Sequence, residues 1–417
     1  MSFSDRLEDY FEGVAAKYLS AVDARPDKSN QHEIGGLPRV GFKRYLGEPA
    51  RGDKTEFNAR LVYISEHDEA PTVCNDTLTW YGATRKDTAR PLEYRLYYKS
   101  NVVTELLNEG DFFLVAKLRD GTLLLVFAPS GGTIETQLRV LFGLGDIGEK
   151  FNVGELEKQT LILPLRLLLE DIGIIFNDGS GADERWLDRL IEKFGETAFP
   201  ATRDFSQFAR ATADEIDPAI EPDIALMQWM EHEEHLFRIF EKHLVGQRLK
   251  LGFGADGDDV DAFVDFSLSV HNRRKSRVGH AFEGHLETVF SANKLEFERG
   301  RKKWQVTENN SKPDFLFPGF ANYHDASFPE DRLFVLGAKT TCKDRWRQVL
   351  AEAARIRTKH LITLEAAISQ NQTDEMRLTG LQLVVPSSIQ GTYSLAQQKW
   401  LLDVASFIDL VRAKSDA

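Results

Sequence analysis

The sequence has 417 residues, of which 42% are hydrophobic. This length predicts two or three domains, and the apolar content is enough to bury a core in each. No apolar run approaches the roughly 20 residues that cross a bilayer, and the acidic start, MSFSDRLEDYFEG, has no hydrophobic secretory region. We therefore expect a cytoplasmic protein without membrane association. Cys74 and Cys342 are too few for a disulfide scaffold or a cysteine zinc site, so free thiols are expected.

The formal net charge of −13 is unusual for a protein that binds nucleic acid, because affinity for phosphate is electrostatic. The charges, however, are segregated along the chain. Acids gather between Asp214 and Asp265, whereas bases gather at residues 273–277, 299–303 and 339–347. A local positive groove is sufficient for binding in an otherwise acidic protein. The overall charge therefore does not exclude a nucleic-acid partner.

Residues from about 30 to 145 are rich in short apolar runs separated by turn residues. Four of these runs predict strands: Arg60–Ile64, Tyr94–Tyr98, Phe112–Ala116 and Leu123–Phe127. Asp120-Gly121 lies between the last two and is a strong hairpin signal. The pattern predicts a mostly β domain, with a small barrel as the expected architecture.

The rest of the chain predicts loops and an α/β region. Residues 178–183 are polar and glycine-rich, which indicates a hinge or loop, and residues 252–259 indicate another. Between them a helix is expected over about 224–244. Later elements are a helix, two strands, a helix, a strand at Leu381–Val385 and a C-terminal helix over about 394–411. We expect domains at 1–170 and 224–417, joined by a linker at 171–223.

The segment from Lys312 to Glu352 carries the most specific chemistry. Asp314 begins an apolar run, Phe315–Phe317, and Lys339 follows a second run, Leu333–Leu336. Short apolar runs bounded by Pro and Gly are typical of buried strands, so we expect Asp314 and Lys339 at neighbouring strand ends. A carboxylate beside an ammonium group is the minimum set for metal-assisted hydrolysis of a phosphodiester.

A second acid commonly stands two residues before such a lysine, but Gly337 occupies that position. From Asp344 onwards DRWRQVLAEAARIRTKH predicts a helix whose apolar stripe includes Trp346 and Val349. On this helix Arg345, Gln348 and Glu352 would share one side. We therefore expect Glu352 to supply the missing carboxylate.

These residues carry a resemblance to a known family. The segments TENNSKPDFLFP, YHD, FPED, AKTTCKDRWRQ and LVVPSS resemble the catalytic domain of EcoRII-type restriction endonucleases. That family lies in the PD-(D/E)XK nuclease superfamily, in the subgroup whose second acid is on the following helix. NRRKSRVGHAFEGHLETVF, at 272–290, resembles the helix that adds a glutamate, and Glu283 matches that position better than Glu287.

The resemblance covers about 272–388 and implies a type II restriction endonuclease that requires Mg²⁺. It implies that Asp314 and Glu352 bind the metal and that Glu283, Asp314, Lys339 and Glu352 are catalytic. Two other classes stay open: a structure-directed repair or recombination nuclease of the same superfamily, and a non-catalytic DNA-binding regulator.

The N-terminal region has its own resemblance. NQHEIGG, at 30–36, and TLTWYGATRKDTARPLEYRLYY, at 77–98, are similar to the DNA-binding pseudobarrel of the same enzymes. The fold implied is a multidomain chain, with this mostly β pseudobarrel followed by an α/β restriction-endonuclease-like domain. Two DNA-binding arms are implied: Asn30, Gln31 and His32 in the first, and Trp80, Tyr81, Arg85, Lys86 and Arg90 in the second. Asn and Gln can read adenine, and Arg and Lys can read guanine; a solvated polar loop is the alternative.

Lys343, Asp344 and Arg345 match the base-reading motif of the family. Arg and Lys suit guanine and Asp suits cytosine, so a CC/GG target is expected, and the resemblance suggests CCWGG. A palindromic site in double-stranded DNA implies a homodimer. The family also implies that the N-terminal domain inhibits cleavage until it binds a second site, so deleting residues before about Ile224 should activate the enzyme. A cytosine methyltransferase is the expected functional partner.

Overall fold

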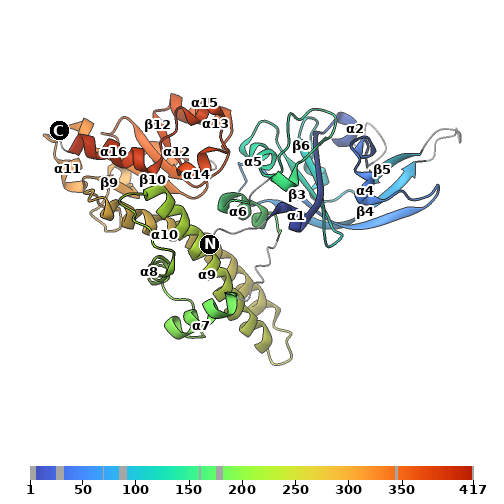
Figure 1. Ribbon diagram of the computed structural model, residues 1–417, viewed down its shortest axis with the longest axis horizontal. Helices are drawn as coiled ribbons and strands as arrows, with labels where there is room; N and C mark the ends of the chain where they lie inside the picture. The colour runs from blue at the N-terminus through green and yellow to red at the C-terminus, as the bar shows by residue number, and fades with distance from the viewer. Residues whose placement is uncertain are drawn as a thin grey trace. The chain divides into compact units, whose positions relative to one another are not determined.

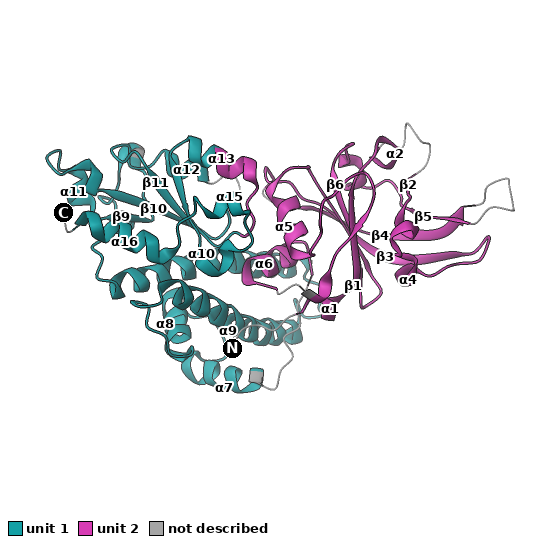
Figure 2. Cartoon of the chain, turned by 45° about the horizontal axis from the view of Figure 1, so that its top comes forward, with its two compact units in different colours: residues 1–2, 176–365, 375–417 teal, residues 3–175, 366–374 magenta. Residues whose placement is uncertain are grey.

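The computed structural model describes residues 6–24, 32–68, 70–83, 92–158, 161–174, 182–342 and 346–415. The chain divides into two compact units (Figure 2). Unit 2 contains residues 3–175 and 366–374, and unit 1 contains mainly residues 176–365 and 375–417. Asn30, Gln31, Arg85, Lys86, Arg90, Lys343, Asp344 and Arg345, all expected to contact DNA, lie outside the described residues. Within the described ranges, no helix is both long and apolar enough to cross a membrane.

Unit 2 is built on an eight-stranded mixed sheet with the order β2-β5-β4-β3-β7-β6-β1-β8 (Figure 1). Its strands are β1 Phe11–Tyr18, β2 Glu33–Ile34, β3 Lys54–Tyr63, β4 Thr72–Ala83, β5 Glu93–Tyr97, β6 Phe112–Leu118, β7 Leu123–Ala128 and β8 Asn152–Val153. Its helices include α1 Leu7–Tyr10, α2 Ala21–Ala24, α4 Lys43–Leu46, α5 Thr133–Leu141 and α6 Leu163–Asp171. The four predicted strands and the mostly β character are confirmed. β1 was not anticipated, although it pairs with β6 along its whole length.

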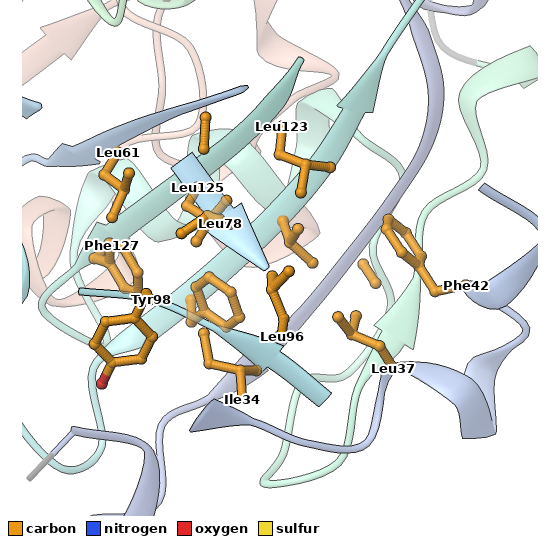
Figure 3. Close-up of a cluster of buried hydrophobic side chains, with 14 of the residues drawn as sticks. Ile34, Leu37, Phe42, Leu61, Leu78, Leu96, Tyr98, Leu123, Leu125 and Phe127 are labelled. Carbon is orange, nitrogen blue, oxygen red and sulfur yellow. The ribbon is translucent and has the colours of Figure 1, made fainter. Parts of the chain in front are cut away.

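β6 and β7 are buried on both faces, and one large apolar cluster of unit 2 lies against one side of the sheet. Alternate residues of neighbouring strands, such as Leu61, Leu78, Leu96 and Leu125, meet in a single apolar cluster (Figure 3). This is the consequence of a period of two in the strands, which sends every second side chain to the same face. Trp80 belongs to the same set and is fully buried.

Unit 1 contains a four-stranded sheet with the order β12-β11-β10-β9. The strands are β9 Phe315–Phe317, β10 Phe334–Lys339, β11 Lys359–Thr363 and β12 Leu381–Val384. β9 is antiparallel to β10, whereas β10, β11 and β12 are parallel. Phe290 from α10 (Val260–Ala292) and Phe407 from α16 (Val404–Ser415) both pack against Phe317 of β9. The short strands are thus buried by aromatic side chains, as their apolar sequences predict.

The helices before this sheet change the expected domain boundary. α7 (Ala182–Phe194) and α8 (Thr202–Thr212) pack on α9 (Pro222–Leu251), and Leu190, Phe205, Phe237 and Phe240 share a buried cluster. The prediction of a linker over 171–223 is therefore wrong for residues 182–212, which are helical and belong to unit 1. Both α7 and α8 are amphipathic, so an apolar face has to be buried against a partner. α9 also extends beyond the predicted 224–244.

The helix expected from Asp344 onwards is much shorter than predicted. Among the described residues of this stretch, only Trp346–Leu350 is helical (α12), and Ala353 has a positive φ of 49°. The predicted C-terminal helix is likewise divided, into α15 (Leu395–Gln398) and α16. The remaining helices of the region are α11 Phe320–His324, α13 Gln370–Leu378 and α14 Ser387–Gln390.

Candidate active site

Asp314 and Lys339 meet where two antiparallel strands lie side by side. Phe315 pairs with Leu336, so the start of β9 lies beside the end of β10. One carboxylate oxygen of Asp314, Oδ2, accepts hydrogen bonds from the backbone N–H of Ala338 and from Lys339 Nζ, both at 2.8 Å. The two side chains remain 21% and 25% exposed, so the pair is open to a ligand. The predicted neighbourhood of these two residues is confirmed.

Glu352 lies in the turn after α12 rather than on a helix face. Its Oε2 atom is buried and has no hydrogen-bond partner among the described residues. Burial and, to a lesser extent, the charge of Asp314 raise the pKa of Glu352 to about 7, although Lys339 and Lys359 oppose the shift. Glu352 is therefore close enough to both residues to feel their charges.

Glu283 lies on α10 and is held by Arg299, to which it is hydrogen-bonded. Burial raises the pKa of Glu283, with a further contribution from Asp314, while Arg299 lowers it. Arg299 Nη1 also donates to Glu287 at 2.8 Å, and Arg301 donates to the same carboxylate at 2.7 Å. The structure thus gathers all four side chains expected to be catalytic and adds Arg299, which the sequence analysis noted only as part of a basic run.

The described DNA-arm residues give a mixed outcome. Trp80 is 0% exposed, donates to the carbonyl oxygen of Gly47 at 3.0 Å and stacks on Tyr94. Its expected contact with DNA is wrong for this conformation, because strand alternation turns the indole into the core. Tyr81, on the opposite face of β4, is half-buried and donates to Glu33. His32 is also half-buried, with its ring against Tyr98.

Part of the expected positive region is neutralised within the helical bundle. Arg277 is buried and pairs with Glu233 and Glu234, and Arg274 pairs with Glu241 at 2.6 Å. Arg274 and Arg277, two of the four bases at 273–277, are thus paired with acids of α9 across two packed helices. Fewer basic side chains without an acidic partner therefore lie near the carboxylates than the sequence suggests.

The carboxylates fit a divalent cation held with few protein ligands. No group of three or more His, Cys, Asp or Glu side chains placed to bind a metal occurs in the described part of the chain. Mg²⁺ often uses only one or two carboxylates and completes its shell with water and substrate phosphate. Asp314 and Glu352 provide two, and the buried, unpartnered Oε2 of Glu352 is an atom that a cation would satisfy.

Comparison with known proteins places this site inside a recognised family region. Residues 237–408 match the family model described as EcoRII C terminal. The type II restriction enzyme EcoRII of Escherichia coli is 40% identical over 210 residues, which cover 50% of this chain and 50% of that protein. The type II restriction enzyme SsoII of Shigella sonnei is 29% identical over 112 residues, or 25% of this chain and 36% of that protein. The chain therefore spans half or less of these relatives' lengths.

Among solved structures, metal-depleted Ecl18kI in complex with uncleaved, modified DNA aligns with a TM-score of 0.44 and 19% identity. The alignment covers 56% of this chain and 85% of that one. The family match at 237–408 contains Glu283, Asp314, Lys339 and Glu352.

Proposed function

We propose that the chain is a type II site-specific restriction endonuclease, on the premise that its residues 237–408 belong to the EcoRII C-terminal family. The observation that carries the proposal is the meeting of Asp314, Lys339 and Glu352 inside the matched region. Lys339 contacts Asp314 directly, and the charges of both residues shift the pKa of Glu352. Such a group of side chains suits the hydrolysis of a phosphodiester.

Asp314 and Glu352 are the proposed ligands of Mg²⁺. A bound divalent cation would polarise the phosphate and make its coordinated water more acidic. Lys339 would place its ammonium group against the negative charge that grows on the phosphate. Glu283, held by Arg299, would orient the attacking water or a water of the cation shell.

The proposed target is a short palindrome containing CC/GG, with CCWGG as the specific expectation from the family resemblance. Lys343, Asp344 and Arg345 would read its bases, and the mostly β unit would bind DNA and regulate cleavage. A two-fold symmetric site would be cut by a homodimer with one centre for each strand. A cytosine methyltransferase would be the functional partner in a restriction-modification system.

The first test replaces the ammonium group. With Mg²⁺ and sequenced phage DNA, the wild-type protein should give discrete fragments whose mapped ends share one sequence. Lys339→Ala should abolish cleavage and retain DNA binding. Lys399→Ala removes an exposed lysine elsewhere in the same unit and is the matched control. Retained cleavage by Lys339→Ala would refute the role of the lysine.

The same digestion separates the alternatives. A structure-directed nuclease would give ends without a common sequence and would prefer branched or flapped DNA over a linear duplex. A non-catalytic regulator would bind DNA and leave it intact with every divalent cation. Chelation with EDTA should stop cleavage, and titration with Mg²⁺ should restore it.

A further inference from the structure

A groove of about 650 Å³ runs beside the candidate active site within unit 1. One wall is α8, the floor is the face of α10 that carries Glu283, and the third side is formed by residues 299–301 and 312–314. Asp314 and Glu283 themselves line it, so the groove opens directly onto the proposed reaction centre. Figure 1 shows α8 next to the α9–α10 pair, with which it is in contact.

The groove is positively charged in spite of its carboxylates. Five basic side chains line it, against the three acids Glu283, Glu287 and Asp314. Each acid already has a basic partner, which is Arg299 for the two glutamates and Lys339 for Asp314. The basic side chains are Arg203, Arg210, Arg299, Arg301 and Lys312.

Two of these bases are free to hold an anion. Arg203 and Lys312 are exposed and form no ion pair within the described ranges. They belong to different walls: Arg203 to α8, and Lys312 to the segment that leads through Pro313 into Asp314. Two residues of extended chain span roughly 7 Å, which is the scale of the step between successive phosphates of a strand. A phosphate at Lys312 would therefore neighbour the phosphate at the cation that Asp314 and Glu352 would bind.

The α8 wall is built to present polar groups. Arg203, Ser206 and Arg210 follow one another at steps of three and four, so they share a face of the helix. Phe205 and Ala209 on the other face are buried in the cluster with Phe237 and Phe240, which fixes the helix in place. The hydroxyl of Ser206 is buried and has no hydrogen-bond partner among the described residues.

Two glycines keep the groove open. A Cβ atom at Gly300 would lie 2.8 Å from the backbone of Lys312, so only glycine lets these two segments approach. At Gly284, next to Glu283 on α10, a Cβ atom would meet no described atom within 4 Å. A side chain added at Gly284 would therefore project into the groove without disturbing the fold.

We propose that this groove binds the sugar–phosphate backbone of the DNA strand next to the cleaved phosphodiester, with Arg203 and Lys312 as its phosphate-binding side chains. α8 precedes the residues matched by the family model, 237–408, so it would be a substrate-binding element supplied from outside that region. The inference rests on the proposed nuclease function and assigns further positioning residues to it.

The test is single-turnover cleavage of a labelled duplex by the full chain in Mg²⁺, with enzyme in excess. The enzyme concentration at half-maximal rate reports binding at the reaction centre, even if the other unit also binds DNA. Arg203→Ala and Lys312→Ala should each raise this concentration several-fold and leave the maximal rate unchanged. In a plot of the logarithm of the half-saturating enzyme concentration against the logarithm of salt concentration, each variant should also have a slope that is lower by about one.

A steric block provides the second arm. Gly284→Leu should raise the half-saturating concentration at least as much as the double variant of Arg203 and Lys312, with an unchanged melting temperature. Gly279→Leu is the matched control, because Gly279 is on the same helix, has equally open space and does not line the groove. Unchanged half-saturation in all four groove variants, with an unchanged salt slope in Arg203→Ala and Lys312→Ala, beside an active wild type, would overturn the inference alone. A wild-type chain that cuts no DNA would instead overturn the proposed function.

Discussion

Arg299 determines how the acids around the candidate centre coexist. Its guanidinium group contacts Glu283 and Glu287 and lies 4.9 Å over the ring of Phe315, the residue after Asp314. Burial raises the pKa of Glu287, but hydrogen bonds from Arg299 and Arg301 outweigh it and leave that pKa lowered. The planar fork of an arginine suits two carboxylates at once. Without Arg299, Glu283 would face Asp314 with only the weaker influence of His280 and Lys339 to offset its charge.

Replacing Arg299 with Met should therefore lower the maximal single-turnover rate by roughly 10- to 100-fold, the usual cost of losing a group that orients a metal or water ligand. The apparent affinity for Mg²⁺, measured by titrating the metal in the cleavage assay, should weaken in parallel. Arg301→Met is the control, because Arg301 is exposed and contacts only Glu287 of the two glutamates. Equal maximal rates for the two variants would contradict a positioning role for Arg299.

His360 on β11 links the stability of unit 1 to pH. Its ring lies between Phe334 and Phe407, and burial lowers its pKa to about 4, despite a hydrogen bond with the backbone of Val335 that raises it. The folded chain thus holds the neutral ring, whereas the unfolded chain is protonated below about pH 6.5. The contribution to stability is complete above pH 6.5 and is lost as pH falls towards 4.

Between pH 7 and pH 5 this residue alone should reduce the free energy of unfolding by about 2 kcal/mol. Urea denaturation of wild type and His360→Phe at both pH values provides the measurement. The variant keeps an aromatic ring between Phe334 and Phe407 but has no titratable group there. Its free energy of unfolding should therefore fall less than that of the wild type over this interval. Equal losses in the two proteins would show that the buried imidazole is not the responsible group.

At the scale of elements, the packing of α12 on β10 explains why position 337 carries no acid. A Cβ atom at Gly337 would lie 2.6 Å from Cγ2 of Val349, so the strand carries no side chain where the helix crosses it. An acid two residues before Lys339 has no room, and Glu352, just beyond α12, is the carboxylate that we propose in its place.

The variant Gly337→Ala should therefore destabilise the chain by about 1–3 kcal/mol through overpacking. Val349→Ala removes the two methyl groups that the new Cβ would meet. In a double-mutant cycle followed by urea denaturation, the second change should recover part of the loss. Additive effects of the two substitutions would mean that the close approach of α12 to β10 is not the cause.

The sequence predicts an element when the local pattern of residues determines it. It does not predict an element that depends on contacts with distant residues. Strands β3, β5, β6, β7, β9, β10 and β12 followed from short apolar runs, and so did the meeting of Asp314 with Lys339, whereas β1, β2, β4, β8 and β11 were not predicted. The stretch after Glu352 is rich in good helix formers, yet it is not helical. Lys359 Nζ donates to the carbonyl oxygens of Ala353 and Ile356, and Arg355 binds the backbone oxygens of Tyr323 and Phe328. The Lys359 bonds are local, but Arg355 binds residues far away in the sequence, and together these contacts outweigh a helix propensity of a few tenths of a kcal/mol per residue.

At the scale of the whole molecule, the boundary between the units decides how the chain can be divided. The family resemblance implies that removing the N-terminal domain activates cleavage, but a cut at Ile224 would remove α7 and α8 together with Asp223. The Asp223 carboxylate accepts backbone hydrogen bonds from Ser387, Val404 and Ala405, which lie at the starts of α14 and α16. Loss of Asp223 would leave buried donors without an acceptor.

A fragment of residues 182–417 should therefore fold, whereas one of residues 224–417 should be much less stable. The shorter fragment lacks Asp223, and it lacks the packing of Leu190 and Phe205 on Phe237 and Phe240. These losses should lower its free energy of unfolding by at least about 3 kcal/mol. Its melting temperature should be lower by roughly 10 °C. Thermal unfolding followed by circular dichroism gives the comparison. If inhibition by the N-terminal domain holds, the longer fragment should also cut DNA with a single site faster than the full chain does. Equal melting temperatures for the two fragments would show that α7 and α8 are not part of the folded unit 1. They would also count against α8 as a wall of the groove.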